Sequence, residues 1–224
     1  MTRLAPAAGG SGRPRLLDLF CGTGGAAVGY YRAGFDVVGV DIKPQPRYPF
    51  EFHQADAMTW PLDGYDAVHA SPPCQAYSVM HSLHNAREHP DLVAPVRERL
   101  ATSGLLYVIE NVPGAPMLDA ITLCGSMFDL RSGPDRYLRR HRLFESNVLI
   151  LVPRCNHRGL AVGVYGHGSA GYLGQRMRTA NVAEARVLMG MDWATQDGMS
   201  QAIPPAYTEY IGVRLRDLLA QEGE

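Results

Sequence analysis

Short apolar runs alternate with amphipathic stretches through the first half of the chain. The runs are rich in leucine and β-branched residues, which favours β-strands, and they cover residues 16–20, 35–40, 51–55, 65–70 and 105–109. Amphipathic stretches at 26–33 and 92–100 predict helices between them. Strands that alternate with helices indicate a mostly parallel sheet covered on both faces, so the predicted fold class is α/β.

The second half has a different pattern. Residues 159–174 contain six glycines among tyrosines and histidines, which excludes a long helix and favours short strands and loops. Helical spacing returns at 182–189 and at 206–219. No internal repeat is present.

These patterns predict a division of the chain into three parts. Residues 1–13 are rich in alanine, glycine and proline without an apolar core, which indicates a disordered leader and not a signal peptide. Residues 14–145 together with 205–224 form the predicted α/β domain. Residues 146–204 form a small Gly-rich lobe.

Composition narrows the class of protein. The chain has 224 residues, of which 46% are hydrophobic and 19% charged, as in ordinary globular proteins, and no apolar run is long enough to span a bilayer. Its four cysteines are far apart and form no CxxC pair, which favours a reducing cytoplasm. Cys155, His157 and His167 are irregularly spaced and lack a fourth ligand, so we expect no metal site.

Charge is distributed unevenly. The formal net charge is −1, but nine arginines and only two acids lie between Arg131 and Arg178. A local excess of arginine indicates an anionic partner, such as the backbone of a nucleic acid.

A Gly-rich turn follows the first predicted strand, with the sequence Cys21-Gly22-Thr23-Gly24-Gly25. The next two predicted strands end at Asp41 and Asp56. A strand, a Gly-rich turn, a helix and a strand ending in an acid are typical of sites for adenosine-containing ligands. Tight packing of helix on sheet would explain the glycines alone, but not the two acids.

Two further strand ends carry reactive side chains. Cys74 follows two prolines after one strand, and Glu110 ends the next strand. An isolated cysteine is more often an inert buried thiol. A thiol held by a stiff turn beside a carboxyl group, however, suits nucleophilic attack assisted by a general acid.

Five motifs in order resemble those of the S-adenosylmethionine-dependent C5-cytosine-specific DNA methyltransferase family, in a compact phage or bacterial form. They are Asp18–Gly25, Ser71–Ser78, Glu110–Val112, Arg139–Arg142 and Ser200–Pro205. The chain departs from the family pattern at Tyr77, Leu138 and Gln201, where phenylalanine, glutamine and asparagine are usual.

The resemblance implies a Rossmann-like class I methyltransferase sheet with a small, Gly-rich target-recognition lobe. It implies that Cys74 adds to C6 of a flipped cytosine while Glu110 acts at N3. Arg142 would contact O2 of the base, and Arg140 would assist phosphate and thiolate. A basic strand that only contacts phosphates is the alternative for both arginines. The base that removes the C5 proton is expected to be water.

The resemblance also implies residues for each ligand. S-adenosylmethionine would contact Phe20, Gly22, Gly24, Gly25, Asp41, Ile42, Asp56, Ala57, Pro72, Gln201, Ala202 and Ile203. Double-stranded DNA would contact Gln75, Ser78, Arg87, Asn111, Tyr165, His167, Arg176 and Arg178. Residues 76–91 are expected to close over the flipped base, the alternative being a solvated connection.

Other hypotheses about the substrate, the cofactor and the activity remain open at this point. The substrate could be tRNA, or the cofactor could be a modified S-adenosylmethionine that places a different group on C5. The non-enzymatic alternative is an inactive DNA-binding regulator. We expect a monomer or weak dimer in the cytoplasm of a bacterium or phage-infected host, without membrane association. The resemblance adds a cognate restriction enzyme as a candidate partner.

Overall fold

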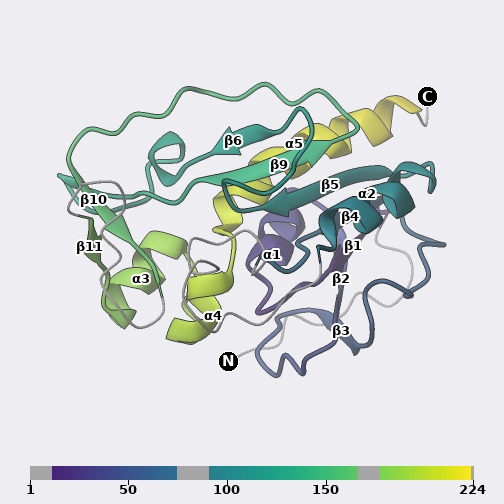
Figure 1. The fold of residues 1–224 in the computed structure, drawn as a ribbon, viewed down its shortest axis with the longest axis horizontal. Helices are drawn as coiled ribbons and strands as arrows, with labels where there is room; N and C mark the ends of the chain where they lie inside the picture. The colour runs from purple at the N-terminus through teal and green to yellow at the C-terminus, as the bar shows by residue number, and fades with distance from the viewer. Residues whose placement is uncertain (1–11, 75–90, 166–176, 223–224) are drawn as a thin grey trace.

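A seven-stranded sheet forms the centre of the molecule (Figure 1). The computed structural model describes residues 12–74, 91–165 and 177–222. In spatial order the strands are β3 (Glu51–Gln54), β2 (Asp36–Asp41), β1 (Arg15–Leu19), β4 (Ala67–Ala70), β5 (Leu106–Asn111), β9 (Arg142–Ser146) and β6 (Ile121–Leu123).

The first five strands of this order are parallel, as the alternation of strands and helices predicted. β9 is antiparallel to both of its neighbours, β5 and β6. The strand order reverses between β1 and β4, and open α/β sheets bind ligands beyond the carboxyl ends of strands at such a point. The predicted Rossmann-like sheet is confirmed.

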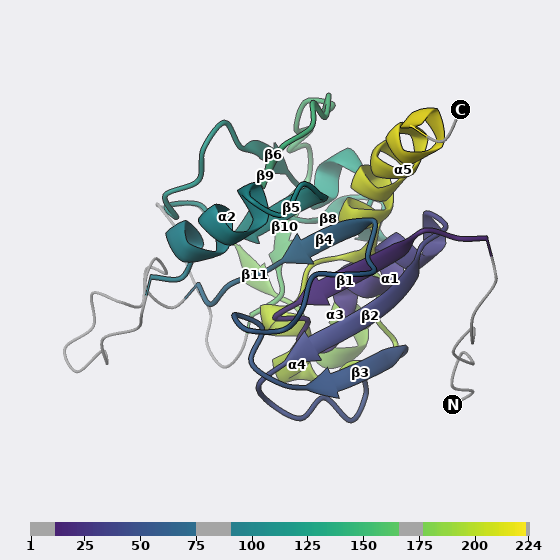
Figure 2. The same cartoon turned by 90° about the vertical axis from the view of Figure 1, so that its right-hand side faces the viewer.

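Helices cover both faces of the sheet (Figure 2). Successive side chains of a strand point to opposite faces. In β1, Leu16 therefore packs in one core with α1 (Gly25–Arg32) and α5 (Pro205–Glu222), whereas Leu17 packs in another with α2 (Val93–Ala101).

A second, four-stranded sheet packs against two short helices. Its order is β11 (Arg178–Thr179), β10 (Leu160–Gly163), β8 (Arg136–Leu138) and β7 (Arg131–Gly133). The helices are α3 (Val182–Met189) and α4 (Gln196–Gln201), and Leu138, Val162 and Leu188 are fully buried in the core that they share.

The second sheet takes strands from both sides of the boundary predicted at residue 146. β7 and β8 belong to it although they lie before residue 145. Each of these two strands has three residues, which is too short for an alternating pattern to show in the sequence.

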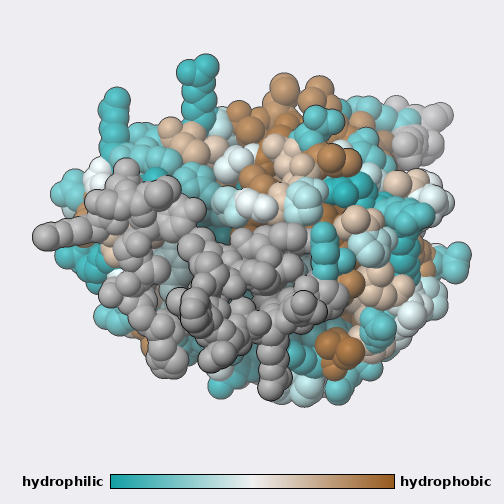
Figure 3. Space-filling view, viewed as in Figure 1, coloured by the Kyte–Doolittle hydropathy of each residue, from teal (hydrophilic) through white to brown (hydrophobic). Residues whose placement is uncertain are grey.

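Residues 147–159 connect the two sheets without a helix or strand. Ile150 packs into the main core, while Leu149 and Leu151 are 73% and 76% exposed. The hydroxyl of Tyr210 donates to the carbonyl of Leu151 at 2.6 Å, and Arg214 Nε donates to that of Leu149 at 3.3 Å. Hydrophobic side chains gather along the upper edge of the view in Figure 3, where this part of the molecule lies.

Within the described part of the chain, none of the helices has the length and apolarity needed to cross a bilayer. The predicted leader falls almost wholly on residues 1–11, which lie outside the described residues.

Candidate active site

The Gly-rich turn bends sharply between β1 and α1. Phe20, Gly22 and Gly24 have φ angles of 57°, 50° and 85°, a region that glycine enters at little cost. The Gly22 amide donates to Asp41 Oδ2 at 3.0 Å, and the Lys43 amide donates to Asp41 Oδ1 at 2.9 Å. The turn and the end of β2 are therefore held together by one carboxylate.

The segment after α4 lies directly on this turn. A Cβ added to Gly25 would be 2.2 Å from the carbonyl oxygen of Ile203, so only glycine permits the approach. The Trp193 indole donates to the Thr23 carbonyl at 2.9 Å from the same side. The predicted cofactor residues at 22–25 and 201–203, distant in sequence, are thus brought together.

Asp18 is a buried acid beneath the turn. One of its oxygens accepts from the Tyr48 hydroxyl at 3.3 Å, and the other has no hydrogen-bond partner among the described residues. Burial raises the pKa of Asp18 to about 8, with the Tyr48 hydrogen bond opposing the shift. The sequence motif included Asp18, but nothing in the sequence indicated a protonated acid.

Side chains at the next strand ends remain exposed. Ile42 is 68% exposed beside Asp41, and Asp56 is exposed with one oxygen accepting from the Met58 amide at 2.9 Å. Ala57 is buried behind them. An exposed aliphatic side chain flanked by carboxylates offers a face to a purine and acceptors to ribose hydroxyl or amino groups.

The segment Ser71–Cys74, which we call the nucleophile turn after the role predicted for Cys74, lies beside the end of β5. β4 and β5 pair in parallel through Ala70 and Ile109, so the chain leaves both strands at the same edge. The Asn111 amide donates to the Pro72 carbonyl at 3.0 Å and fixes the start of the turn. Cys74 is half-buried at its end.

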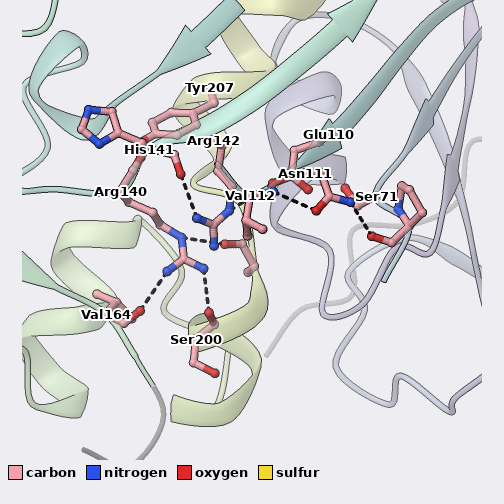
Figure 4. A network of polar contacts seen from close by, with 12 residues as sticks. Ser71, Glu110, Asn111, Val112, Arg140, His141, Arg142, Val164, Ser200 and Tyr207 are labelled. Carbon is pink, nitrogen blue, oxygen red and sulfur yellow. Dashed lines mark hydrogen bonds and ion pairs between the residues drawn. The ribbon is translucent and has the colours of Figure 1, made fainter. Parts of the chain in front are cut away.

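Glu110 forms an ion pair with Arg142, whose Nε is 3.0 Å from Glu110 Oε1 (Figure 4). Register explains the contact. Glu110 of β5 is opposite Phe144 of the antiparallel β9, and Arg142 is two residues away on the same face. Arg142 also donates to the His141 carbonyl at 2.9 Å.

Burial and nearby charges shift the pKa values of Glu110 and Cys74. Burial raises the pKa of Glu110, and Arg142, a hydrogen bond from Ser71 and Arg140 oppose the shift. Burial also raises the pKa of the Cys74 thiol, the Glu110 charge raises it further, and the two arginines lower it. A carboxyl group that keeps its proton more readily than usual is suited to act as an acid.

A buried polar chain leads to Glu110 from the far side. The Tyr30 hydroxyl is 3.0 Å from His69 Nδ1, and His69 Nε2 is 2.9 Å from Ser71 Oγ. Burial lowers the pKa of His69 to about 3, so the imidazole is neutral. With Tyr30 donating to Nδ1, Nε2–H donates to Ser71, which leaves the Ser71 proton for Glu110. No pattern in the sequence indicated a role for Tyr30 or His69, because both lie inside apolar elements.

Arg140 is committed to the protein backbone. It is 4% exposed, and its Nη1 and Nη2 donate to the carbonyls of Val164 and Ser200 at 2.8 and 2.7 Å, while Nε donates to that of Ala202 at 3.1 Å. Figure 4 shows the side chain turned into this ring of carbonyls. Each of the three guanidinium nitrogens therefore already bonds a backbone carbonyl, so in this structure Arg140 positions the segments that carry Val164, Ser200 and Ala202.

Only some of the residues predicted to contact DNA belong to the part of the chain that the structure describes. Gln75, Ser78, Arg87, His167 and Arg176 lie outside the described residues, as does nearly all of the predicted 76–91 lid.

Three others are described. Asn111 is 1% exposed, and its side chain is bonded to the Pro72 carbonyl, so it positions the nucleophile turn. Tyr165 is half-buried and accepts from Gln196 through its carbonyl at 2.9 Å. Arg178 forms an ion pair with Glu184.

The basic segment is only partly available to an anion. Acids or carbonyls already bind four of its arginines. Arg131 pairs with Asp129 and donates to the Pro134 carbonyl. The contacts of Arg140, Arg142 and Arg178 are described above. Arg136, Arg154 and Arg158 are exposed. These three are the better candidates for contacts with a phosphate backbone.

The expectation of no metal-ligand set also needs correction. The ligand atoms of Cys124, His141, Cys155 and His157 lie within 4.8 Å of one another. β6 and β9 pair through Leu123 and Arg142, which places Cys124 opposite His141. Such cross-strand neighbours cannot be found from spacing along the sequence.

No family model matches the sequence, and no curated protein matches it. Among solved structures, the chain is similar to the Dnmt2 methyltransferase of S. pombe, with 14% identity, 92% of this chain and 99% of that chain covered, and a TM-score of 0.62. It is also similar to the Entamoeba histolytica methyltransferase EhMeth, with 13% identity, 93% and 99% covered, and a TM-score of 0.54.

A third similar structure is described as a DNA modification methyltransferase encoded within an E. coli prophage. It is 21% identical over 58% of this chain, which spans 45% of that protein, with a TM-score of 0.39. The two matches that cover nearly all of this chain show its fold. The chain has the Rossmann-like fold seen in these methyltransferases.

Proposed function

We propose that the protein transfers a methyl group from S-adenosylmethionine to C5 of a cytosine flipped out of DNA, through a covalent bond between Cys74 and C6. The observation that carries the proposal is the Glu110–Arg142 ion pair at the strand end next to Cys74. It supplies an acid and a cation to a half-buried thiol, which is the set of groups that attack on a pyrimidine ring requires.

The residues around the Gly-rich turn fit the cofactor. Glycines with positive φ allow the backbone to approach the ligand closely, and the adjacent segment 201–203 closes one side. Asp41 and Asp56 offer acceptors, and Ile42 offers an exposed apolar surface for the adenine. When bound, S-adenosylmethionine supplies an electrophilic methyl group.

The chain's own residues then perform the remaining steps. The Cys74 thiolate donates an electron pair to C6 while Glu110 gives its proton to N3, so that C5 becomes nucleophilic. Arg142 holds the carboxyl group in place and stabilises the thiolate. After C5 is methylated, loss of its proton to water breaks the Cys74–C6 bond. Glu110 recovers the N3 proton and the thiolate is regenerated.

Covalent trapping tests the nucleophile. A duplex containing 5-fluorocytosine cannot lose fluorine from C5, so wild-type protein incubated with it and S-adenosylmethionine should form a stable adduct. Peptide mass spectrometry should locate the adduct on Cys74 and on none of the other three cysteines. If Cys74→Ser were trapped equally well, the assignment of the nucleophile would be wrong.

Radiolabel transfer tests the substrate. Labelled S-adenosylmethionine should label duplex DNA and not tRNA, and digestion should release 5-methylcytosine. Labelling of tRNA alone would replace DNA by RNA. Tight binding to DNA without transfer by wild-type protein would favour the inactive regulator instead, and a different group on C5 would favour a modified cofactor.

A further inference from the structure

Four side chains outside the proposed catalytic set converge near its edge. Cys124 follows β6, His141 precedes β9, and Cys155 and His157 belong to the 147–159 segment. One ligand atom from each lies within 4.8 Å of the other three. We call these residues the Cys2His2 cluster.

The spacing within the cluster matches a tetrahedral metal site. Cys124 Sγ is 3.5 Å from His157 Nε2, and Cys155 Sγ is 3.5 Å from His141 Nε2. Zinc bonds of about 2.3 Å to sulfur and about 2.0–2.1 Å to nitrogen, at tetrahedral angles, put sulfur and nitrogen about 3.5–3.6 Å apart. Two thiolates and two imidazoles are also a complete ligand set for a structural zinc ion.

Supporting contacts hold two of the ligands in place. Ser126 Oγ donates to Cys124 Sγ at 3.4 Å and accepts from the Asn156 amide at 3.1 Å. The His157 ring stacks on Tyr137 at a centroid distance of 5.8 Å and an angle of 9°. Contacts that orient the ligands themselves are a usual part of a metal site.

Exposure argues against a cluster held by hydrogen bonds alone. Cys155 and His157 are exposed and lie on a segment without a helix or strand. Weak thiol–imidazole hydrogen bonds in contact with water contribute little free energy. They do not offset the conformational entropy that is lost when such side chains are fixed. A metal ion bound by all four would offset that cost.

We propose that the Cys2His2 cluster binds one zinc ion as a structural site. The ion ties the 147–159 segment to the end of β6 and to the start of β9. His141 is the residue between Arg140 and Arg142. The site therefore fixes the backbone that carries both arginines.

Metal analysis of the full-length protein tests the proposal without reference to methyl transfer. Protein purified under reducing conditions with zinc supplied, and then desalted, should contain one zinc ion per chain by mass spectrometry. Cys155→Ser and His157→Gln should lose most of this zinc while keeping the circular dichroism of the fold, since both positions are exposed. Cys74→Ser is the matched control: it also removes a thiol and should keep its zinc.

Cobalt replacement gives a second measurement on wild-type protein. The Co²⁺ form should show the absorption of a tetrahedral site with thiolate charge transfer, and Cys155→Ser should weaken the latter. Wild-type zinc far below one per chain with no cobalt–thiolate absorption would overturn the proposal. So would equal zinc in Cys155→Ser, or a disulfide between Cys124 and Cys155 in freshly isolated protein.

Discussion

The Arg142 guanidinium lies 3.0 Å from the Glu110 carboxylate, and only 14% and 8% of the two side chains are exposed. Burial alone would favour the protonated acid, and the cation alone would favour the carboxylate. The two effects oppose each other in Glu110, where burial is the larger. The same cation lowers the pKa of the Cys74 thiol.

Arg142→Met should shift the pH profile of methyl transfer to higher pH. Loss of the cation raises the pKa of Glu110 and that of Cys74 in the same direction, because Arg142 lowers both. Both limbs of a profile measured by single-turnover transfer should therefore shift to higher pH, with a reduced maximum. A lower maximum with both limbs unmoved would show that Arg142 does not act on these groups.

Ser71→Ala should affect Glu110 selectively. The Ser71 hydrogen bond lowers the pKa of Glu110, so its loss should move the Glu110 limb to higher pH and leave the Cys74 limb in place. Glu110→Gln is the reference variant, which removes that limb and lowers the rate about 10²–10⁴-fold. A downward shift in Ser71→Ala would contradict the direction of this hydrogen bond.

Arg140→Met should destabilise the protein more than it changes cofactor affinity. It leaves the carbonyls of Val164, Ser200 and Ala202 without their buried donor, at a cost of about 3–5 kcal/mol in the free energy of unfolding. Urea denaturation measures the loss. Arg136→Met, an exposed arginine of the same segment, should change that free energy by less than about 0.5 kcal/mol. Equal effects would mean that the carbonyl contacts contribute nothing.

Asp18→Asn should remove a pH dependence of stability. The folded protein keeps the Asp18 proton up to about pH 8, whereas an unfolded chain releases it near pH ~4. Between these values the unfolded state binds fewer protons, so wild-type stability contributed by Asp18 falls as pH rises. Unfolding of ligand-free protein from pH 5 to 8 should show a shallower decline in Asp18→Asn. Asp63 is exposed, so Asp63→Asn should show the wild-type pH dependence of stability. An unchanged slope in Asp18→Asn would contradict the raised pKa of Asp18.

Gly25→Ala should separate α1 from the 201–203 segment. The new methyl group would be 2.2 Å from the Ile203 carbonyl, and relief requires the two segments to move apart. Overpacking of this kind costs about 1–3 kcal/mol, and calorimetry should also show weaker binding of S-adenosylmethionine. Gly133→Ala, with nothing within 4 Å of the added carbon, is the control. If Gly25→Ala bound S-adenosylmethionine as tightly as wild-type protein does, the close approach of Gly25 to Ile203 would not be needed for cofactor binding.

The elements of the large sheet could be predicted because each has a strong local pattern. The apolar run 16–20 and the β-branched run 35–40 are observed as β1 and β2 within a residue or two. The turn residues between them carry their own chemistry, since positive φ favours glycine.

What could not be predicted depends on pairing between distant strands. From the sequence, Arg140 cannot be distinguished from an arginine that binds phosphate. Only the structure shows that its guanidinium bonds the carbonyls of Val164, Ser200 and Ala202. The opposition of Cys124 and His141 follows from the β6–β9 register, which no periodicity in either segment encodes. Strands of three residues, such as β7 and β8, are likewise too short to leave a pattern.

The location of β7 and β8 has a consequence for engineering. An exchange of the small lobe between relatives, cut at residue 146, would leave half of the second sheet with one parent and half with the other. The new partners would meet across the β8–β10 ladder, where Arg140 also crosses to reach Val164. A transplant that keeps its own hydrogen-bond ladder must carry residues 130–138 along with everything from 159 to 203, leaving β9 to the recipient.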